Sequence, residues 1–338
     1  MPLSLRPFRH LAVLFLTLVC TQAGAQDGAA SGTLPDGTIL SRDTLRPQPE
    51  RRAFFQGLME RRGFSADAAA RALDEVVVLR ITYLSGGLRV AGFLVEPPGE
   101  GPFPAVIYNR GGNRAFGSVT ETTVFAYLVP LAARGYVVIA SQYRGGPGSE
   151  GADEFGGADV DDVLNLIPLL EGQPRADASR IGMVGSSRGG LMTYLALART
   201  DRLRAAVVIG GMSDAFAAVE ERPEMETDVM AEMVPNWAAE REAALLARSP
   251  VRWAERLHRG TALLLLHGSA DWRVVPTEAL EMATALLAVQ HPFRFVMYEG
   301  SDHSLTEHRA ESFGLLTDWL DRYVRDGEPL PNVEPHGD

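Results

Sequence analysis

The chain has 338 residues, of which 46% are hydrophobic and 22% charged, an ordinary composition for a globular protein. Its formal net charge of −11 at pH 7 argues against a nucleic-acid binder, because no excess of cations is available to meet phosphates. All 32 basic residues are arginine, which excludes Ser–Lys dyads, Schiff-base lysines and the P-loop lysine together.

The first 25 residues have the pattern of a secretory signal peptide. Arg6 and Arg9 form a positive region, residues 11–20 are apolar, and an A-x-A cleavage site ends at Ala25. A permanent N-terminal anchor, or a lipid attached at Cys20, is the alternative, although the apolar run is short for a membrane span. We predict cleavage after Ala25 and a secreted or periplasmic protein without stable membrane insertion. The mature chain would contain no cysteine, which excludes disulfides and thiol catalysis.

Residues 26–74 are predicted to form an N-terminal leader. Its first half is rich in Gly, Ser, Pro and Asp, which suits a flexible segment. Two short helices are expected, over residues 51–61 and 65–73, with Ser65 capping the second.

From residue 75 to residue 326, apolar runs typical of strands alternate with helical patterns, which predicts a single α/β catalytic domain. Residues 213–257 form a helical insert that is too long for a simple crossover, and the tail over 327–338 is expected to be loose. The alternation predicts a mostly parallel, doubly wound sheet of eight strands. The predicted strands are 76–79, 88–95, 104–108, 136–140, 180–184, 205–209, 262–266 and 293–298.

One motif carries the chemistry: residues 185–189 read Gly-Ser-Ser-Arg-Gly, which matches G-x-S-x-G. An apolar strand runs into this motif and a helix runs out of it, so it fits the sharp turn that lifts a nucleophilic serine out of a sheet. Ser187 is centred between the glycines and is the predicted nucleophile. Ser186 is the alternative by position, but it is not centred.

The base that a nucleophilic serine needs is predicted to be His303, in the loop after the last strand. The alternative is that His303 is an ordinary histidine of a surface loop. The carboxylate that orients the imidazole is predicted to be Asp271, in the loop after the preceding strand, and Asp302 is the competitor. The chain order Ser, Asp, His resembles that of the α/β-hydrolases.

The oxyanion donors are expected to be backbone N–H groups. One is that of Arg188, at the start of the helix after the motif. The second would come from the loop after strand 104–108, where Arg110 and Gly111 begin a glycine-containing turn. The alternative is that the loop after strand 104–108 is only a tight turn and supplies no oxyanion donor.

Over residues 104–324 the sequence resembles the catalytic domain of the prolyl oligopeptidase family. Four stretches carry the resemblance: Gln142-Tyr143-Arg144-Gly145-Gly146 with Gly148, the motif at 185–190, the H-G-x-x-D-x-x-V-P signature at 267–276, and Gly300 to His303. The resemblance implies an α/β-hydrolase fold and the triad Ser187, Asp271 and His303. It also implies a role for Arg273 in binding a substrate carbonyl, for which a surface ion pair is the alternative. Arg110 stands where the family has an oxyanion tyrosine or histidine, and the stretch before the domain is too short for the family's β-propeller.

We therefore predict a serine hydrolase of the prolyl oligopeptidase type that cleaves peptide bonds through an acyl-enzyme, without cofactor or metal. Its expected partner is a peptide or a small ester, and no nucleic acid. A carboxylesterase that uses the same triad is the first alternative, because one triad serves both bonds. A catalytically silent binding module of the same fold is the second.

Overall fold

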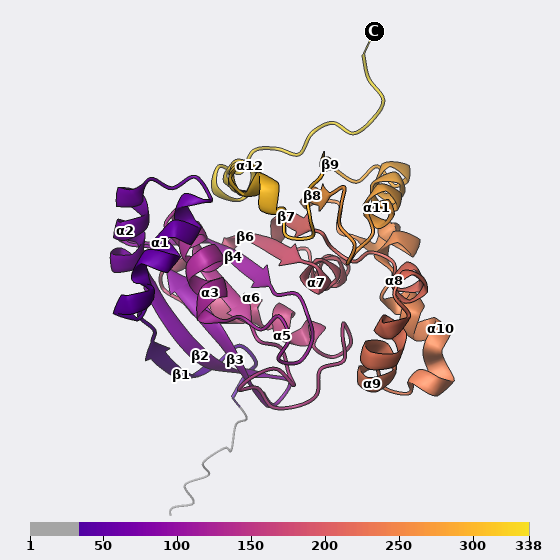
Figure 1. Ribbon diagram of the computed structural model, residues 1–338, viewed down its shortest axis with the longest axis horizontal. Coiled ribbons are helices and arrows are strands. Elements are labelled where there is room, and N and C mark those ends of the chain that lie inside the picture. Colours follow the sequence, from indigo (N-terminus) through magenta and orange to yellow (C-terminus); the bar gives the residue numbers. More distant parts are fainter. Residues whose placement is uncertain (1–33, 338) are drawn as a thin grey trace, which may run out of the picture. The chain divides into compact units, whose positions relative to one another are not determined.

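The computed structural model describes residues 34–337, in which a sheet of nine strands forms the centre (Figure 1). The strand order is β1-β2-β3-β5-β4-β6-β7-β8-β9. The pairs β1–β2, β2–β3 and β3–β5 are antiparallel, and all pairs from β5 to β9 are parallel. The strands are β1 (Ile39–Thr44), β2 (Val77–Ser85), β3 (Leu88–Glu96), β4 (Phe103–Asn109), β5 (Val137–Ser141), β6 (Ala176–Ser186), β7 (Leu203–Ile209), β8 (Ala262–Gly268) and β9 (Phe293–Tyr298).

The strand that the sequence analysis did not predict is β1, which pairs with β2 from Ile39↔Tyr83 to Thr44↔Leu79. Most of its side chains are exposed, so it lacks the apolar run by which the other strands are recognised. Backbone hydrogen bonds to β2 hold this edge strand instead. Residues 34–74 therefore belong to the same compact unit as the rest of the described chain. The expected signal peptide lies outside the described residues.

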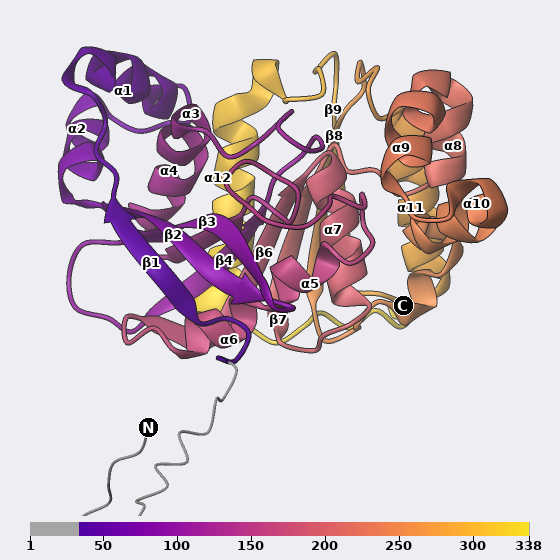
Figure 2. The same cartoon turned by 90° about the horizontal axis from the view of Figure 1, so that it is seen from below.

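Helices cover both faces of the sheet (Figure 2). They are α1 (Arg52–Glu60), α2 (Ala66–Glu75), α3 (Glu121–Thr123), α4 (Val129–Ala132), α5 (Val160–Leu164), α6 (Leu166–Glu171), α7 (Arg188–Leu197), α8 (Ala215–Glu221), α9 (Ala231–Met233), α10 (Trp237–Ala247), α11 (Pro276–Ala288) and α12 (Arg309–Leu320). Shorter 3-10 and π-helical turns are η1 (Pro49–Arg51), η2 (Val124–Leu128), η3 (Met225–Met230), η4 (Pro250–Arg252), η5 (Ala254–Arg256), η6 (Thr306–His308) and η7 (Asp321–Arg325). The predicted N-cap is confirmed, because the Ser65 side chain accepts a hydrogen bond from the N–H of Ala68 at 3.2 Å.

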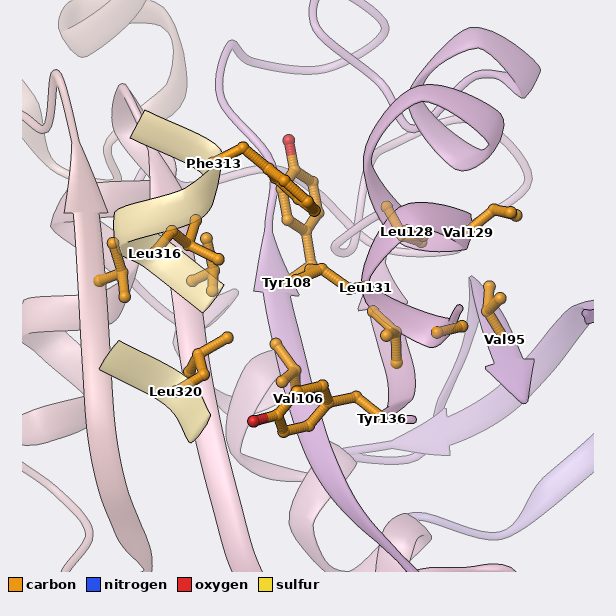
Figure 3. Close-up of a cluster of buried hydrophobic side chains, with 14 of the residues drawn as sticks. Val95, Val106, Tyr108, Leu128, Val129, Leu131, Tyr136, Phe313, Leu316 and Leu320 are labelled. Carbon is orange, nitrogen blue, oxygen red and sulfur yellow. The ribbon is translucent and has the colours of Figure 1, made fainter. Parts of the chain in front are cut away.

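Alternation along the strands divides the core into two layers, because successive side chains of a strand point to opposite faces. On β4, Val106 and Tyr108 face α1, α2, α4 and α12, whereas Ala105 and Ile107 face α5, α6, α7 and α11. Figure 3 shows part of the first layer, with Phe313, Leu316 and Leu320 on α12 and Val106 and Tyr108 on β4. Both faces are buried, which explains why the parallel strands read as continuous apolar runs.

The helical insert packs as a third cluster of its own. Its apolar side chains, among them Met230 and Leu245, contact Leu191 of α7 and Val274 after β8. The insert therefore borders the carboxyl ends of the strands. In open α/β sheets, ligands bind at these ends. No helix in the described range is long and apolar enough to cross a bilayer.

Candidate active site

Ser187 lies between β6 and α7 with φ 58° and ψ −127°, a conformation that costs a non-glycine residue free energy. The turn is tight on both sides. A Cβ atom on Gly185 would overlap the carbonyl oxygen of Gly189, and a Cβ atom on Gly189 would overlap that of Asn109. The two glycines of the motif are therefore required by close approach of the backbone, and together they present Ser187 at the end of the strand.

Asp271 and His303 are brought together by the loops after β8 and β9. Nδ1 of His303 lies 2.7 Å from Oδ2 of Asp271, a geometry in which Nδ1–H donates to the carboxylate and leaves Nε2 to accept a proton. Asp302, the competitor, accepts hydrogen bonds from its own loop, from N–H of Ser304 at 2.9 Å and of Thr306 at 3.0 Å. The geometry therefore selects Asp271 as the partner of the imidazole.

A backbone contact with β7, the strand between β6 and β8, places Ser187 at the same edge of the sheet as Asp271 and His303. The N–H of Ser187 donates to the carbonyl oxygen of Ile209 at 2.9 Å. The next residue, Gly210, lies against both partners: a Cβ atom there would be 3.2 Å from Nδ1 of His303 and 3.3 Å from Oδ2 of Asp271. Within residues 34–337, no hydrogen bond joins the Ser187 hydroxyl to His303. In serine hydrolases this bond often tightens only in the substrate complex.

Asp271 is held in its ionised form. Its side chain is buried, which by itself raises its pKa, but hydrogen bonds from His267 and His303 outweigh burial and hold the pKa well below its usual range. The N–H groups of Arg273 and Val274 donate to its other oxygen at 2.8 and 3.1 Å. A carboxylate that stays charged favours an imidazolium next to it, as a general base requires in the transition state.

His267 is a second neighbour of Asp271, and the sequence analysis gave it only as the first residue of the signature at 267–276. Its Nε2 lies 3.3 Å from Oδ2 of Asp271 and 2.9 Å from the carbonyl oxygen of Val274. Both of those atoms are acceptors, so Nε2 carries the proton. The four-residue spacing between His267 and Asp271 does not by itself indicate this contact, because His267 lies in β8 and Asp271 in the loop after it, and not on one helix.

The expected oxyanion residues surround Ser187. Arg188 is the first residue of α7, so its N–H has no acceptor within the helix. A Cβ atom on Gly111 would lie 3.0 Å from Cβ and 3.6 Å from Oγ of Ser187, so the backbone of Gly111 runs directly beside the hydroxyl.

The Arg110 side chain is buried, and every N–H group of its guanidinium has an acceptor. A guanidinium has five N–H donors, and all five are used here by backbone carbonyl groups. Nε donates to Gln142 at 3.1 Å, Nη1 to Gly111 at 3.1 Å and Phe116 at 3.3 Å, and Nη2 to Arg114 at 2.9 Å and Gln142 at 2.8 Å. The side chain therefore braces the loop after β4, and no N–H remains for a substrate oxyanion.

Arg188 braces the same loop from the other side. Its guanidinium contacts Asp153 at 2.6 and 2.8 Å, pairs with Asp159, and donates to the carbonyl oxygen of Gly112 at 3.0 Å. Burial lowers the pKa of Arg188, but the two aspartates outweigh burial and raise it. The sequence analysis did not single out Asp153 or Asp159 for this role, because nothing in the spacing of these residues indicates the pairing.

A cavity of about 110 Å³ opens on Ser187. Its walls combine polar side chains, among them Asn113 and Arg222, with the apolar side chains of Phe116, Phe155, Met212, Met225, Val229 and Val274. Arg273, the predicted substrate-binding residue, is part of this lining, with its guanidinium 6.0 Å from the ring of Phe116 and 5.1 Å from that of Trp272. In the described chain no carboxylate pairs with Arg273. Among residues 34–337, no group of three His, Cys, Asp or Glu side chains could hold a metal.

Comparison with known proteins places these features in a family. A family model described as the prolyl oligopeptidase family matches residues 122–327. The uncharacterized peptidase YtmA of Bacillus subtilis is 29% identical over 78% of this chain and 98% of its own length. Dipeptidyl-peptidase 5 of Porphyromonas gingivalis is 27% identical, over 66% of this chain but only 34% of its own. Among solved structures, Pyrococcus horikoshii acylaminoacyl peptidase superposes with a TM-score of 0.66 at 22% identity, over 78% of this chain and 44% of that one.

Proposed function

Because the family match spans more than half of the chain, the protein belongs to the prolyl oligopeptidase family, and we propose that it cleaves peptide bonds by acyl transfer to Ser187. Membership confirms the predicted α/β-hydrolase fold and the prediction of a serine-type peptidase, and it does not favour the esterase alternative. The observation that carries the proposed mechanism is the 2.7 Å hydrogen bond between His303 and Asp271, at the sheet edge where Ser187 ends its strand.

In the first step His303 Nε2 takes the hydroxyl proton as Oγ of Ser187 attacks the carbonyl carbon. The tetrahedral oxyanion is held by the backbone N–H groups of Arg188 and Gly111. When the C–N bond breaks, His303 returns the proton to the leaving amine. Water then attacks the acyl-enzyme by the same route and releases the acid.

The cavity on Ser187 defines the acyl side of the substrate. Its aromatic and sulfur-containing walls suit an apolar side chain of moderate size at the residue whose carbonyl is attacked. Arg273 lies at the rim of this cavity, where its guanidinium can donate to a carbonyl oxygen of the preceding residue.

The mechanism is tested with a fluorophosphonate probe and two substrates. The purified protein should label, and Ser187→Ala should not, whereas Ser186→Ala, the matched control, should label normally. An aminoacyl anilide should be turned over as well as a short acyl nitrophenyl ester, because a peptidase must cleave the less reactive amide bond. Labelling that survives Ser187→Ala, or turnover of the ester alone, would contradict the proposal.

We also propose that the protein is exported. The support is the pattern of the first 25 residues, in which a positive region, an apolar run and an A-x-A site follow one another. Expression of the full chain with its native N-terminus should yield a mature protein that begins at Gln26, measured by intact mass. Retention of Met1 in the protein recovered from cells that express it would contradict this.

A further inference from the structure

A second cavity, of about 150 Å³, lies next to the site on the α12 side of the sheet. We call it the arginine pocket; it is lined by Arg62 and Arg309, by the rings of Tyr108, Tyr127 and Phe313, and by Ser304. Ser186, which precedes the nucleophile, also belongs to its wall. Figure 3 shows Tyr108 on β4 and Phe313 on α12 approaching each other across this space.

Arg62 is a buried cation without a protein anion. It follows α1 and is 5% exposed, and its guanidinium lies 3.9 Å from the centre of the Tyr127 ring. Its one hydrogen bond goes from Nη1 to the carbonyl oxygen of Leu58, at 3.3 Å. No carboxylate lies within 4.0 Å of it in the chain from 34 to 337. Burial lowers the pKa of Arg62, and the positive charge of Arg309 adds to this effect.

Arg309, at the start of α12, is the second cation of the pocket and is half-buried. Its Nη2 donates to Oγ1 of Thr306 at 3.1 Å, while its Nε is buried without an acceptor in the structure. Burial raises the pKa of Asp302, but hydrogen bonds from Thr306 and Ser304, together with the positive charge of Arg309, lower it. Arg309 and Asp302 form no ion pair within residues 34–337. Buried charge is normally paired, as Arg188 is with Asp153 and Asp159. A buried Arg62 without an acid, with the half-buried Arg309 in the same cavity, therefore indicates an anionic ligand.

We propose that the arginine pocket binds the leaving half of the substrate, as a single apolar residue whose free C-terminal carboxylate pairs with Arg62 and Arg309. This inference rests on the proposed function. The apolar rings would contact the side chain, and the two guanidinium groups would bind the carboxylate, which Arg recognises with paired N–H donors.

The chemistry of the reaction assigns the pocket to the leaving side. His303 must give its proton to the leaving amine, so the leaving group lies against the histidine loop. Ser304 and Leu305, which follow His303 directly, and Arg309 at the start of α12 line the arginine pocket. The 110 Å³ cavity is lined instead by Arg188 and Gly112, next to the oxyanion donors. A cavity of about 150 Å³ accommodates one benzene-sized group, which limits the leaving group to one residue. The predicted substrates are therefore peptides cut before an apolar C-terminal residue.

The test compares an N-acylated dipeptide that ends in phenylalanine with the same dipeptide carrying a C-terminal amide. The intact protein should cleave the acid about tenfold or more faster in kcat/KM than the amide, because only the acid offers a charge to the pocket. Arg62→Gln and Arg309→Gln should each reduce this ratio toward one. Arg61→Gln, an exposed neighbour on the same turn, is the matched control and should keep the ratio.

Equal cleavage of acid and amide by the unmodified protein would overturn the pocket assignment, as would a ratio that survives Arg62→Gln. An inhibition measurement tests the same assignment without variants: free phenylalanine should inhibit anilide hydrolysis, and phenylalaninamide should not. Fluorophosphonate labelling separates the two proposals. Labelling without a preference for the acid overturns the pocket alone, whereas absence of labelling and of all turnover overturns the proposed function and the pocket with it.

Discussion

Replacing Glu278 by glutamine should stabilise the protein at alkaline pH and leave its stability in acid nearly unchanged. Glu278 lies on α11 and is 2% exposed. One carboxylate oxygen accepts the N–H groups of Ser213 at 2.8 Å and Asp214 at 3.0 Å. Burial raises the pKa of Glu278 from its ordinary value of 4.5 to about 7, against these two hydrogen bonds.

The sign follows from proton binding. Between pH 4.5 and 7 the folded protein holds a proton on Glu278 that the unfolded chain has released. The contribution of this group to stability is therefore full below pH 4.5 and is lost as the pH rises through 7. The difference between the two pKa values corresponds to about 3 kcal/mol. Glutamine resembles the protonated acid, and its carbonyl oxygen can still accept both N–H groups.

The assay is urea unfolding at a series of pH values from about 5 to about 8.5. The variant should gain up to about 3 kcal/mol over the unmodified protein at the alkaline end and little at the acid end. Glu281→Gln, on an exposed position of the same helix, should run parallel to the unmodified protein at every pH. If the unfolding free energy of Glu278→Gln also runs parallel to that of the unmodified protein across this pH range, the Glu278 carboxyl is ionised in the folded protein at neutral pH. That result would refute the reasoning.

Three further predictions concern the site. Arg110→Ala should cost about 3 kcal/mol or more in unfolding free energy, because buried carbonyl groups lose their donor, yet the folded variant should keep kcat within about tenfold; a loss of roughly a hundredfold would make the side chain an oxyanion donor. Gly210→Ala should lower kcat by about tenfold or more, because φ of Gly210 is +52° and the new methyl group would press on His303. Stopped-flow measurement of acylation would detect this loss. An unchanged rate would mean that the loops carrying Asp271 and His303 shift without cost. Asp271→Asn should reduce kcat by roughly 10⁴-fold and Asp302→Asn by less than about tenfold, and the reverse order would exchange their roles.

The local pattern of apolar residues was sufficient to predict most strands of the sheet. The eight expected strands all occur, because each has a run of apolar or alternating side chains that only a buried strand explains. The ninth, β1, escaped prediction because pairing with β2 is a backbone interaction that leaves most of its side chains exposed and free to be polar. The turn around Ser187 was also predictable, since its two glycines answer a steric demand of the adjacent backbone.

The partners of the charged side chains were not predictable in this way. Arg110 could have been an oxyanion donor or a brace, and only the five carbonyl contacts around its guanidinium decided for the brace. The same holds for Arg188 with Asp153, which is 35 residues away, and for the second histidine on Asp271.

The sequence alone thus determined the order of the elements, the nucleophile motif and the two loops that carry Asp271 and His303, because these depend on neighbours along the chain. Only the tertiary structure decided which donor meets which acceptor, and that two arginines share one cavity without an acid. Ion pairs and hydrogen bonds act over about 3 Å in space, and the segments that supply them are set side by side by the packing of the whole sheet.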